Sequence, residues 1–387
     1  MKVLHVIPSL WQGDGGPSHA LRAMERALAA QGVTVETATT DDDGPGLRSG
    51  KAGQGAVLEE ETVRRYFAKR SEFYKWSPGF ARWISRAVTD YDLLHVHALF
   101  SFTTTAASQA ARRAGVPYIV RPLGTLAPWG MEHRRPWLKR ASLRMIETPL
   151  LRHAAAVHFT SDEEMREAAA LRIDMRPVVI PLGIDMPPPV VRTPPGDGSV
   201  RALFLSRLHP KKNLDGLLDA MAMLRDEFPQ LRLTIAGSGE TEYESALRAR
   251  ADVLGLADRV SWLGFVEGAA KLRAFRDSDI FVLPSHSENF GIAAAEALAH
   301  GLPCVLSSGV AIARDVVAAA AGVEVATSAE SIAAGLRLIM PPAVRAPMQA
   351  SAVCLARERY SLGAMGTRLK QLYMDISGSR RGLPAKR

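Results

Sequence analysis

The sequence predicts an α/β protein with two doubly wound halves, and three observations carry this prediction. Short apolar runs alternate with longer helical patterns along most of the 387 residues, as in βα units with parallel strands. A segment rich in Pro and Gly, residues 186–199, then breaks the pattern. A second alternating series follows it. At about 150 residues per domain, the length also favours two domains.

The first half contains a regular series of predicted elements. We expect a glycine-containing loop at 8–16 and a helix from Pro17 to Gln31, because Pro suits a first helical turn and Gly32 suits a helix end. Residues 41–55 are rich in Gly and Asp and are predicted to form a loop. The strands of this half are expected at 2–7, 33–39, 93–97, 118–121, 156–159 and 177–180.

The second half repeats the alternation, and its strands are expected at 200–205, 231–236, 260–263, 280–283 and 304–306. The predicted organisation is therefore an N-terminal domain over 1–185, a linker over 186–199 and a C-terminal domain over 200–360. A final helix over 361–376 and a disordered basic tail over 377–387 complete it.

Composition excludes several classes of protein. Only two cysteines occur, Cys304 and Cys354, so neither a disulfide scaffold nor a four-cysteine zinc site can form. The first eleven residues lack the features of a secretory signal, and no uncharged stretch is free of Gly and Pro for long enough to span a membrane. We therefore expect a cytoplasmic protein. The usual signatures of nucleic-acid modules are absent, so no nucleic-acid partner is predicted.

The net charge of +8 is concentrated in residues 112–152. This segment contains two tryptophans and only two acidic residues, Glu132 and Glu147, beside nine cations. Two interpretations stay open: docking to an anionic membrane surface, at the inner face of the membrane, or a solvated helix face. The cations are Arg112, Arg113, Arg121, Arg134, Arg135, Lys139, Arg140, Arg144 and Arg152.

Ligands of open α/β sheets bind where the carboxyl ends of the strands converge, so we sought chemistry there. In the first βα turn, Gly15 and Gly16 precede a helix, which suits either an approaching phosphate or simply a tight turn. In the second half, Arg207 and Lys212 follow the first strand. Cations just before a helix are unfavourable unless an anion binds, so they indicate a diphosphate clamp; the alternative is a solvated loop.

A second group of polar residues follows the strand at 280–283. Glu288 lies in the predicted loop, Gly291 opens an alanine-rich helix, and Glu296 lies within that helix. A lone carboxylate on an apolar helix is costly to bury without a partner, and a ribose diol would be one. Backbone amides around Asn289, Phe290 and Gly291 would face phosphate oxygens. The alternatives are a helix cap for Glu288 and an exposed position for Glu296.

Together these motifs resemble family 4 of the retaining, nucleotide-sugar-dependent glycosyltransferases, over residues 2–374. The features that carry the resemblance are the Gly15–Gly16 turn, the segment 180–185, the paired Arg207 and Lys212, and Glu288 and Glu296 with seven intervening residues. Two positions depart from the usual pattern: Asn289 stands where glycine is commoner, and Leu182 where asparagine is commoner.

The resemblance implies a GT-B fold, with two Rossmann-like domains facing across a cleft. The acceptor would bind the N-terminal domain and the nucleotide sugar mainly the C-terminal one, while a helix over Leu362 to Met374 would cross back to the first domain. It further implies retaining, metal-independent transfer of a hexosyl group to a saccharide or lipid-linked saccharide, in cell-surface polysaccharide biosynthesis. The nucleotide sugar is a co-substrate, and no other cofactor is expected.

The same resemblance assigns roles to individual residues. Arg207 and Lys212 become the diphosphate clamp, Glu288 the contact to the donor sugar and Glu296 the contact to the ribose. His97 becomes the active-site histidine near the donor sugar, with a buried structural histidine as the alternative. His95 and His97 point the same way along a strand, but a zinc site needs further ligands and none is evident, so no metal site is predicted.

Four rival functions remain open. A glycoside hydrolase would use Glu288 and Glu296 as acid and nucleophile but leaves the paired cations without a role. A metal-dependent transferase would use one of three Asp-x-Asp pairs, at 41/43, 90/92 or 277/279. An NAD-dependent oxidoreductase lacks its glycine fingerprint here. A two-domain nucleotide-binding protein without transferase turnover is the fourth.

Overall fold

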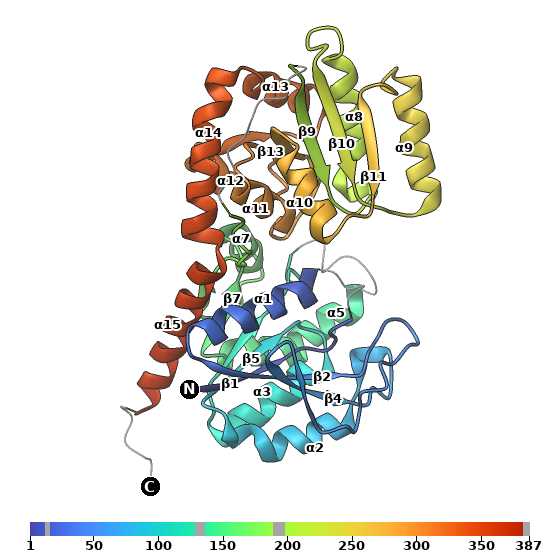
Figure 1. Ribbon diagram of the computed structural model, residues 1–387. Helices are drawn as coiled ribbons and strands as arrows, with labels where there is room; N and C mark the ends of the chain where they lie inside the picture. Colours follow the sequence, from blue (N-terminus) through green and yellow to red (C-terminus); the bar gives the residue numbers. More distant parts are fainter. Residues whose placement is uncertain (12–15, 128–135, 189–197, 382–387) are drawn as a thin grey trace. The chain divides into compact units, whose positions relative to one another are not determined.

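The computed structural model describes residues 1–11, 16–127, 136–188 and 198–381. The chain divides into two units, residues 1–183 with 362–387, and residues 184–361. Each unit has one sheet of mainly parallel strands with helices beside it (Figure 1), which confirms the predicted fold class. The predicted linker falls largely on residues 189–197, outside the described part of the chain.

The first unit is built on an eight-stranded sheet of order β3-β4-β2-β1-β5-β6-β7-β8, in which only β3 is antiparallel to its neighbour. Chain order reverses between β1 and β5, so the loops that leave their carboxyl ends diverge there. The elements are β1 Lys2–Val6, α1 Gly16–Ala30, β2 Thr34–Thr40, β3 Ala56–Glu59, β4 Thr62–Phe67, α2 Pro78–Ala87, β5 Leu93–His97, α3 Phe102–Ala114, β6 Tyr118–Arg121, α5 Pro136–Ser142, α6 Thr148–His153, β7 Ala156–Phe159, α7 Asp162–Ala169, β8 Pro177–Val179 and α15 Leu362–Arg381.

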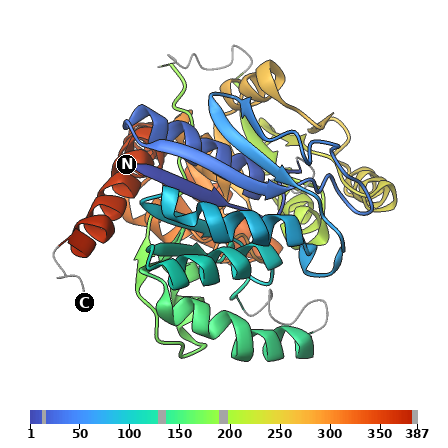
Figure 2. The ribbon, with the colours of Figure 1, turned by 90° about the horizontal axis from the view of Figure 1, so that it is seen from below.

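Successive residues of these buried strands face two different helical layers. Leu94, Val96 and Val120 point toward α2 and α3. Leu93 and Ile119 point the other way, toward α1 and α15. Figure 2 shows α15 lying beside α1 on this second face. The sheet is therefore covered on both sides, although one covering helix comes from the end of the chain.

The C-terminal helix α15 belongs to the first unit. Its Met365, Leu369 and Tyr373 are fully buried, and Gly366 lies against α1, where an added Cβ would come within 2.6 Å of the carbonyl oxygen of Ala27. The helix continues to Arg381, so the prediction of a disordered tail from residue 377 is wrong for residues 377–381. The preceding turns are anchored by packing and the helix simply propagates from them.

The second unit has a six-stranded parallel sheet of order β11-β10-β9-β12-β13-β14, which is the doubly wound arrangement. Chain order reverses between β9 and β12. The elements are β9 Val200–Leu205, α8 Leu214–Met223, β10 Leu231–Ala236, α9 Thr241–Val253, β11 Val260–Gly264, α10 Gly268–Arg276, β12 Ile280–Leu283, α11 Ile292–Ala299, β13 Cys304–Ser307, α12 Ala313–Ala318, β14 Gly322–Val325, α13 Ala329–Ile339 and α14 Pro342–Leu355.

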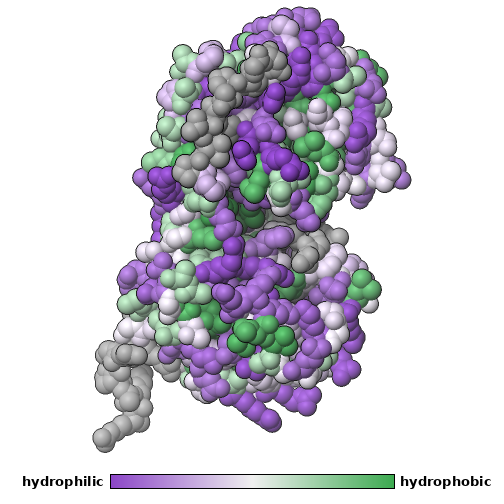
Figure 3. Space-filling view, viewed as in Figure 1, coloured by the Kyte–Doolittle hydropathy of each residue, from purple (hydrophilic) through white to green (hydrophobic). Residues whose placement is uncertain are grey.

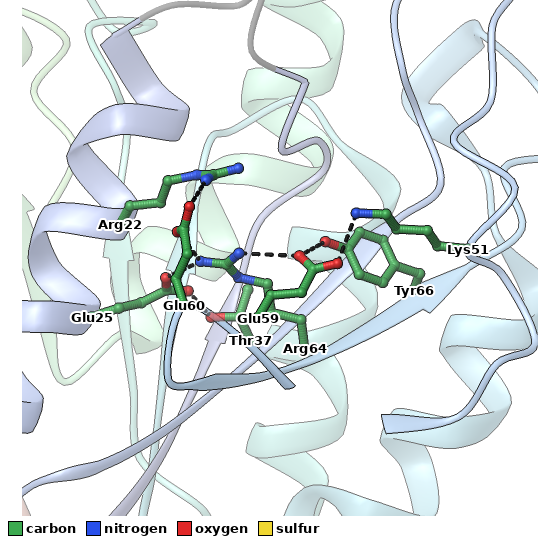
Figure 4. Close-up of polar contacts among 8 residues, drawn as sticks. All are labelled: Arg22, Glu25, Thr37, Lys51, Glu59, Glu60, Arg64 and Tyr66. Atoms are coloured by element: carbon green, nitrogen blue, oxygen red, sulfur yellow. Dashed lines mark hydrogen bonds and ion pairs between the residues drawn. The ribbon is translucent and has the colours of Figure 1, made fainter. Parts of the chain in front are cut away.

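A buried charge network holds the β3–β4 hairpin to α1 (Figure 4). The Arg64 side chain on β4 is 1% exposed and donates to Glu25 on α1 over 2.6 Å and to Glu59 on β3 over 3.1 Å. Glu60 closes the network by pairing with both Arg64 and Arg22. The residues of the two-residue turn, Glu60 and Glu61, both have positive φ, an unfavourable conformation that this pairing stabilises.

A belt of buried histidines crosses the sheet under α15. His5 on β1, His95 and His97 on β5, and His158 on β7 are all fully buried. Burial, and then the Arg121 guanidinium, lower the pKa of His5 and His158 to about 3. The histidines are therefore neutral at pH 7 in the folded protein.

Replacing Arg64 with Met tests the charge network, because it leaves the Glu25 carboxylate buried without its cation. We expect a loss of about 3–5 kcal/mol in the free energy of unfolding, measured with urea. Arg22→Met is the matched control, since its partner Glu60 is half exposed, and should cost less than about 1 kcal/mol. Equal losses in the two variants would contradict the network's role.

The histidine belt predicts a pH dependence of stability. Because the folded-state pKa of these histidines lies below the unfolded value of about 6.5, stability is complete above that pH and falls as the pH drops toward 3. Each such histidine contributes a slope of about 1.4 kcal/mol per pH unit. The free energy of unfolding is measured with urea at pH 7.0 and 5.5. In His158→Gln its dependence on pH should be weaker by the contribution of one histidine. The exposed His19→Gln should keep the full slope.

Candidate functional site

Two loops lie side by side at the reversal point of the second unit. One follows β9 and includes the short 3-10 helix Pro210–Lys212; the other runs over residues 284–291 after β12. The amide of His286 donates to the carbonyl of Lys211 over 2.9 Å, and the Asn213 side chain donates to the carbonyl of Pro284 over 3.2 Å. These bonds fix one loop against the other through the protein's own groups.

The structure brings two of the predicted site residues into direct contact. Lys212 and Glu288 form an ion pair, and their side chains are 17% and 23% exposed. Arg207 lies in the same strand-end loop as Lys212 and is exposed. The arrangement offers one exposed guanidinium and one half-buried ammonium. A phosphate group would compete with the Glu288 carboxylate for this ammonium.

The turn after β13 positions the backbone of Glu288. The amide of Glu288 donates to the carbonyl of Gly309 over 2.7 Å, and Ala311 donates back to the carbonyl of Glu288 over 3.1 Å. A Cβ atom on Gly309 would lie 2.5 Å from the carbonyl oxygens of Ser285 and His286. Only glycine permits this approach, so Gly309 is part of the support of the site.

Glu296 has a protein partner, which corrects the sequence expectation of a carboxylate without one. Lys271 on α10 donates to it over 2.6 Å, and the Glu296 side chain is 23% exposed. Sequence neighbours alone could not show Lys271, because the two residues meet only through tertiary packing. The assignment of Glu296 to a ribose stays a prediction.

The residues between Glu288 and α11 divide into exposed and buried positions. Asn289 is exposed, whereas Phe290 is buried and packs edge-on against Tyr360 with ring centroids 5.6 Å apart. Gly291 adopts φ +94° and caps the N-terminus of α11. Phe290 thus anchors the loop, and any ligand contact from these residues comes from backbone amides or from Asn289.

Sequence reasoning missed two glycines beside the β9 loop. A Cβ atom on Gly237 would lie 1.8 Å from the carbonyl oxygen of Ser206, and one on Gly239 would lie 2.1 Å from that of Leu208. The Leu208 amide also donates to the carbonyl of Ser238 over 2.9 Å. The sequence did hold a signal for these glycines, because they come directly after the predicted strand at 231–236. The preceding predicted strand, at 200–205, is followed by Arg207.

In the first unit, the predicted residues are not gathered into a site. Gly15 lies outside the described residues, and Gly16 is the exposed first residue of α1. His97 is fully buried at the carboxyl end of β5, and burial, then His5 and Arg121, hold its pKa well below the usual range. Its contact with a donor sugar stays a prediction.

The backbone beyond β5 and β6 is unusual. Ala98, Phe100 and Leu123 have positive φ, a conformation that non-glycine residues adopt only where the surroundings enforce it. Hydrogen bonds next to Leu123 hold this conformation in place. Buried Glu164 accepts from the amides of Gly124 and Thr160 over 2.7 and 2.8 Å. Such strained strand ends are typical of ligand-binding edges.

One group of histidines in the described part of the chain has the spacing of metal ligands. Nitrogen atoms of His5, His95 and His97 lie within 4.8 Å of one another. The neighbouring Arg121 is fully buried, and its positive charge opposes a second cation. Apart from His97 Nδ1, the nitrogens of these three histidines are engaged in hydrogen bonds with each other, with His158 or with Tyr373. The donor set therefore fits a hydrogen-bonded cluster better than a metal centre.

Comparison with known proteins agrees with this geometry. Residues 15–183 match the family described as "Glycosyl transferase 4-like domain", and residues 192–342 match "Glycosyl transferases group 1". A D-inositol 3-phosphate glycosyltransferase of Streptomyces scabiei is 30% identical over 338 residues, covering 76% of this chain and 72% of the relative. Jonesia denitrificans has one that is 28% identical, covering 79% and 78%.

Two solved structures are similar in fold to nearly the whole chain. HepE from Anabaena, in a complex with UDP-glucose, is 21% identical with a TM-score of 0.71 and covers 99% of this chain and 100% of its own. Sucrose-phosphate synthase from Thermosynechococcus elongatus is 18% identical with a TM-score of 0.73, covering 98% and 100%. The chain therefore belongs to family 4 of the glycosyltransferases, with the GT-B fold, and is a glycosyltransferase.

Proposed function

We propose that this enzyme transfers a hexosyl group from a nucleoside diphosphate sugar to a saccharide or lipid-linked saccharide, with retention and without a metal ion, in cell-surface polysaccharide biosynthesis. The observation that carries the proposal is the Lys212–Glu288 ion pair at the reversal point of the second sheet, with exposed Arg207 in the same strand-end loop. Doubly wound sheets bind nucleotides at this point.

The proposed chemistry follows from charge. Cleavage of the bond between sugar and diphosphate leaves negative charge on the phosphate, and fixed cations lower the barrier by stabilising it. Lys212 would exchange Glu288 for a phosphate oxygen, which frees the carboxylate to accept from sugar hydroxyls. Arg207 supplies a second cation, so the site can neutralise the leaving group with its own side chains. The departing phosphate would accept the proton of the acceptor hydroxyl.

The names of similar proteins support the proposed substrate classes. HepE, a protein of similar fold, is known in a complex with UDP-glucose, and the two relatives described above are named D-inositol 3-phosphate glycosyltransferase. D-inositol 3-phosphate is a ring that carries several hydroxyl groups, and a saccharide acceptor would offer a hydroxyl nucleophile of the same kind. Glu288 and Glu296 each pair with a lysine of their own, an arrangement that does not favour the hydrolase alternative.

Titration of the purified protein with UDP and GDP in excess EDTA tests the donor site. Calorimetry should show saturable binding of one of the two nucleotides. Lys212→Ala should bind it about 10- to 100-fold more weakly, because a charge-assisted hydrogen bond to phosphate is lost. Lys211→Ala is the matched control in the same turn, and its binding should stay within about twofold.

The results that count against the proposal contradict different parts of it. Binding that requires a divalent ion would contradict metal independence alone. Absence of binding by both nucleotides in a folded wild-type protein, or equal losses in the two lysine variants, would contradict the diphosphate clamp.

We further propose that the enzyme docks on an anionic membrane at its cytoplasmic face. Trp137, Arg140, Arg144 and Met145 are exposed at helical spacing along α5 and the π-helical turn Leu143–Glu147 that follows it, which joins apolar and cationic side chains in one stripe. Arg121 does not belong to this surface, because it is buried on β6, and Arg134 and Arg135 lie outside the described residues.

One face of the protein surface and the helices of the described residues indicate how such an attachment would be made. Hydrophilic residues cover most of the face drawn in Figure 3, with apolar residues in small patches. Within the described residues, no helix has the length and apolar character needed to cross a bilayer. Attachment through this stripe would therefore be peripheral, at the level of the lipid headgroups.

Vesicle flotation tests the docking surface. The wild-type enzyme should float with phosphatidylglycerol vesicles and not with phosphatidylcholine vesicles. Trp137→Ser combined with Met145→Ser should lose at least about half of this binding. As the control, Met223→Ser combined with Val253→Ser removes exposed apolar residues of the second unit and should leave flotation unchanged. No preference for the anionic vesicles would refute the proposal.

A further inference from the structure

The buried histidine belt of the first unit contains an unbranched chain of side-chain hydrogen bonds. Its contacts, in order, are His97 Nε2 to His5 Nδ1 over 3.1 Å, His5 Nε2 to Tyr373 Oη over 3.3 Å, Tyr373 Oη to His95 Nδ1 over 2.7 Å, His95 Nε2 to His158 Nδ1 over 3.3 Å, and His158 Nε2 to the Ile180 carbonyl over 2.8 Å. All four histidines and Tyr373 are fully buried.

The last contact fixes the direction of the chain. A carbonyl oxygen only accepts, so His158 Nε2 carries a hydrogen. A neutral imidazole has a single N–H, so His158 Nδ1 must accept, and His95 Nε2 is its donor. Burial disfavours the charged form of every histidine in the belt, and the positive charge of Arg121 lowers the pKa of each one further, so all four are neutral.

The same logic passes through Tyr373. His95 Nδ1 carries no hydrogen, so the Tyr373 hydroxyl donates to it. With its hydrogen engaged, the Tyr373 oxygen accepts from His5 Nε2. His5 Nδ1 is then bare and accepts from His97 Nε2. His97 Nδ1 is the remaining end, and it is a buried atom with no hydrogen-bond partner.

We propose that Tyr373, from the C-terminal helix, is a positioning residue that fixes His97 as the Nε2–H tautomer and so presents Nδ1 as a hydrogen-bond acceptor for a substrate hydroxyl. The kinetic part of this inference rests on the proposed function, whereas the tautomer does not. An acceptor nitrogen selects a group that donates a hydrogen, such as a sugar hydroxyl, and disfavours a phosphate or carboxylate oxygen.

Removal of the Tyr373 hydroxyl has unequal consequences for the two halves of the chain. In Tyr373→Phe, His95 and His158 keep their tautomers because the Ile180 carbonyl still fixes them. The His5 Nε2–H loses its acceptor, so either tautomer of the His5–His97 pair now leaves one buried N–H unpaired, at His5 Nε2 or at His97 Nδ1. The preference for one tautomer is therefore lost, and part of the His97 population carries its hydrogen on Nδ1, as a donor.

Nuclear magnetic resonance of the full-length protein with ¹⁵N-labelled histidine tests this inference. At pH 7, His5, His95, His97 and His158 should all be neutral with the hydrogen on Nε2. In Tyr373→Phe, only His5 and His97 should change. Tyr360→Phe is the matched control, because it removes the hydroxyl of another buried tyrosine, and all four signals should stay unchanged.

Kinetics on the same proteins give the functional consequence. Tyr373→Phe should lower kcat/KM for the nucleotide sugar by about 2- to 10-fold, because a smaller fraction of His97 presents a bare Nδ1, while the affinity for the free nucleoside diphosphate stays unchanged. Wild-type protein that binds no nucleotide would refute the proposed function and leave the tautomer result standing.

Three results would overturn the inference. One is an Nδ1–H or doubly protonated state at any of the four histidines of the wild-type protein. Another is a spectrum and kcat/KM that Tyr373→Phe leaves unchanged. The third is stoichiometric zinc in the purified enzyme that is removed with loss of these signals, because a ligating nitrogen cannot carry the hydrogen that the chain requires. The wild-type spectrum decides the first point even if the variant does not fold.

Discussion

The candidate site depends on one constraint, the fastening of two strand-end loops to each other in the second unit. His286 donates to the Lys211 carbonyl and the Asn213 side chain to the Pro284 carbonyl, so Lys212 and Glu288 are held together by the loops that follow β9 and β12. Glycine positions around them let the chain pass this closely. A partly exposed ion pair contributes about 0–1 kcal/mol, and a charge-assisted bond to phosphate contributes about 1.5–3 kcal/mol. The ion pair therefore satisfies both side chains, but an anion can still replace Glu288.

The first unit solves a different problem, because it buries charged and titratable groups beneath the helices that cover its sheet. Helix α1 takes part in both solutions: Glu25 pairs with Arg64, while the adjacent Met24 lies over Arg121. Each buried group survives because it has partners or stays neutral. The C-terminal helix is thus more than a cover, since its Tyr373 supplies the middle hydroxyl of the histidine chain.

Apolar periodicity predicted most strands closely, including β5, β6, β7, β9, β10 and β12, because buried parallel strands are nearly continuous apolar runs. The β3–β4 hairpin was missed for a physical reason. In this hairpin the charged Arg64 is buried and the apolar Val63 is only half buried, which is the reverse of the usual strand pattern. The turn is Glu60–Glu61, whereas such turns favour Asn-Gly. In the site, sequence identified Lys212 and Glu288 but not Lys271, since a partner distant in the chain leaves no local pattern.

The direction of the histidine chain bears on the proposed reaction through charge. Positive charge develops on the anomeric carbon as the sugar leaves its diphosphate, so an imidazolium beside the donor sugar would oppose the transition state, whereas a neutral imidazole would not. Burial and Arg121 keep His97 neutral, and the chain that starts at the Ile180 carbonyl decides which of its nitrogens is bare. A neutral His97 with a bare Nδ1 is thus what the proposed contact to a sugar hydroxyl requires.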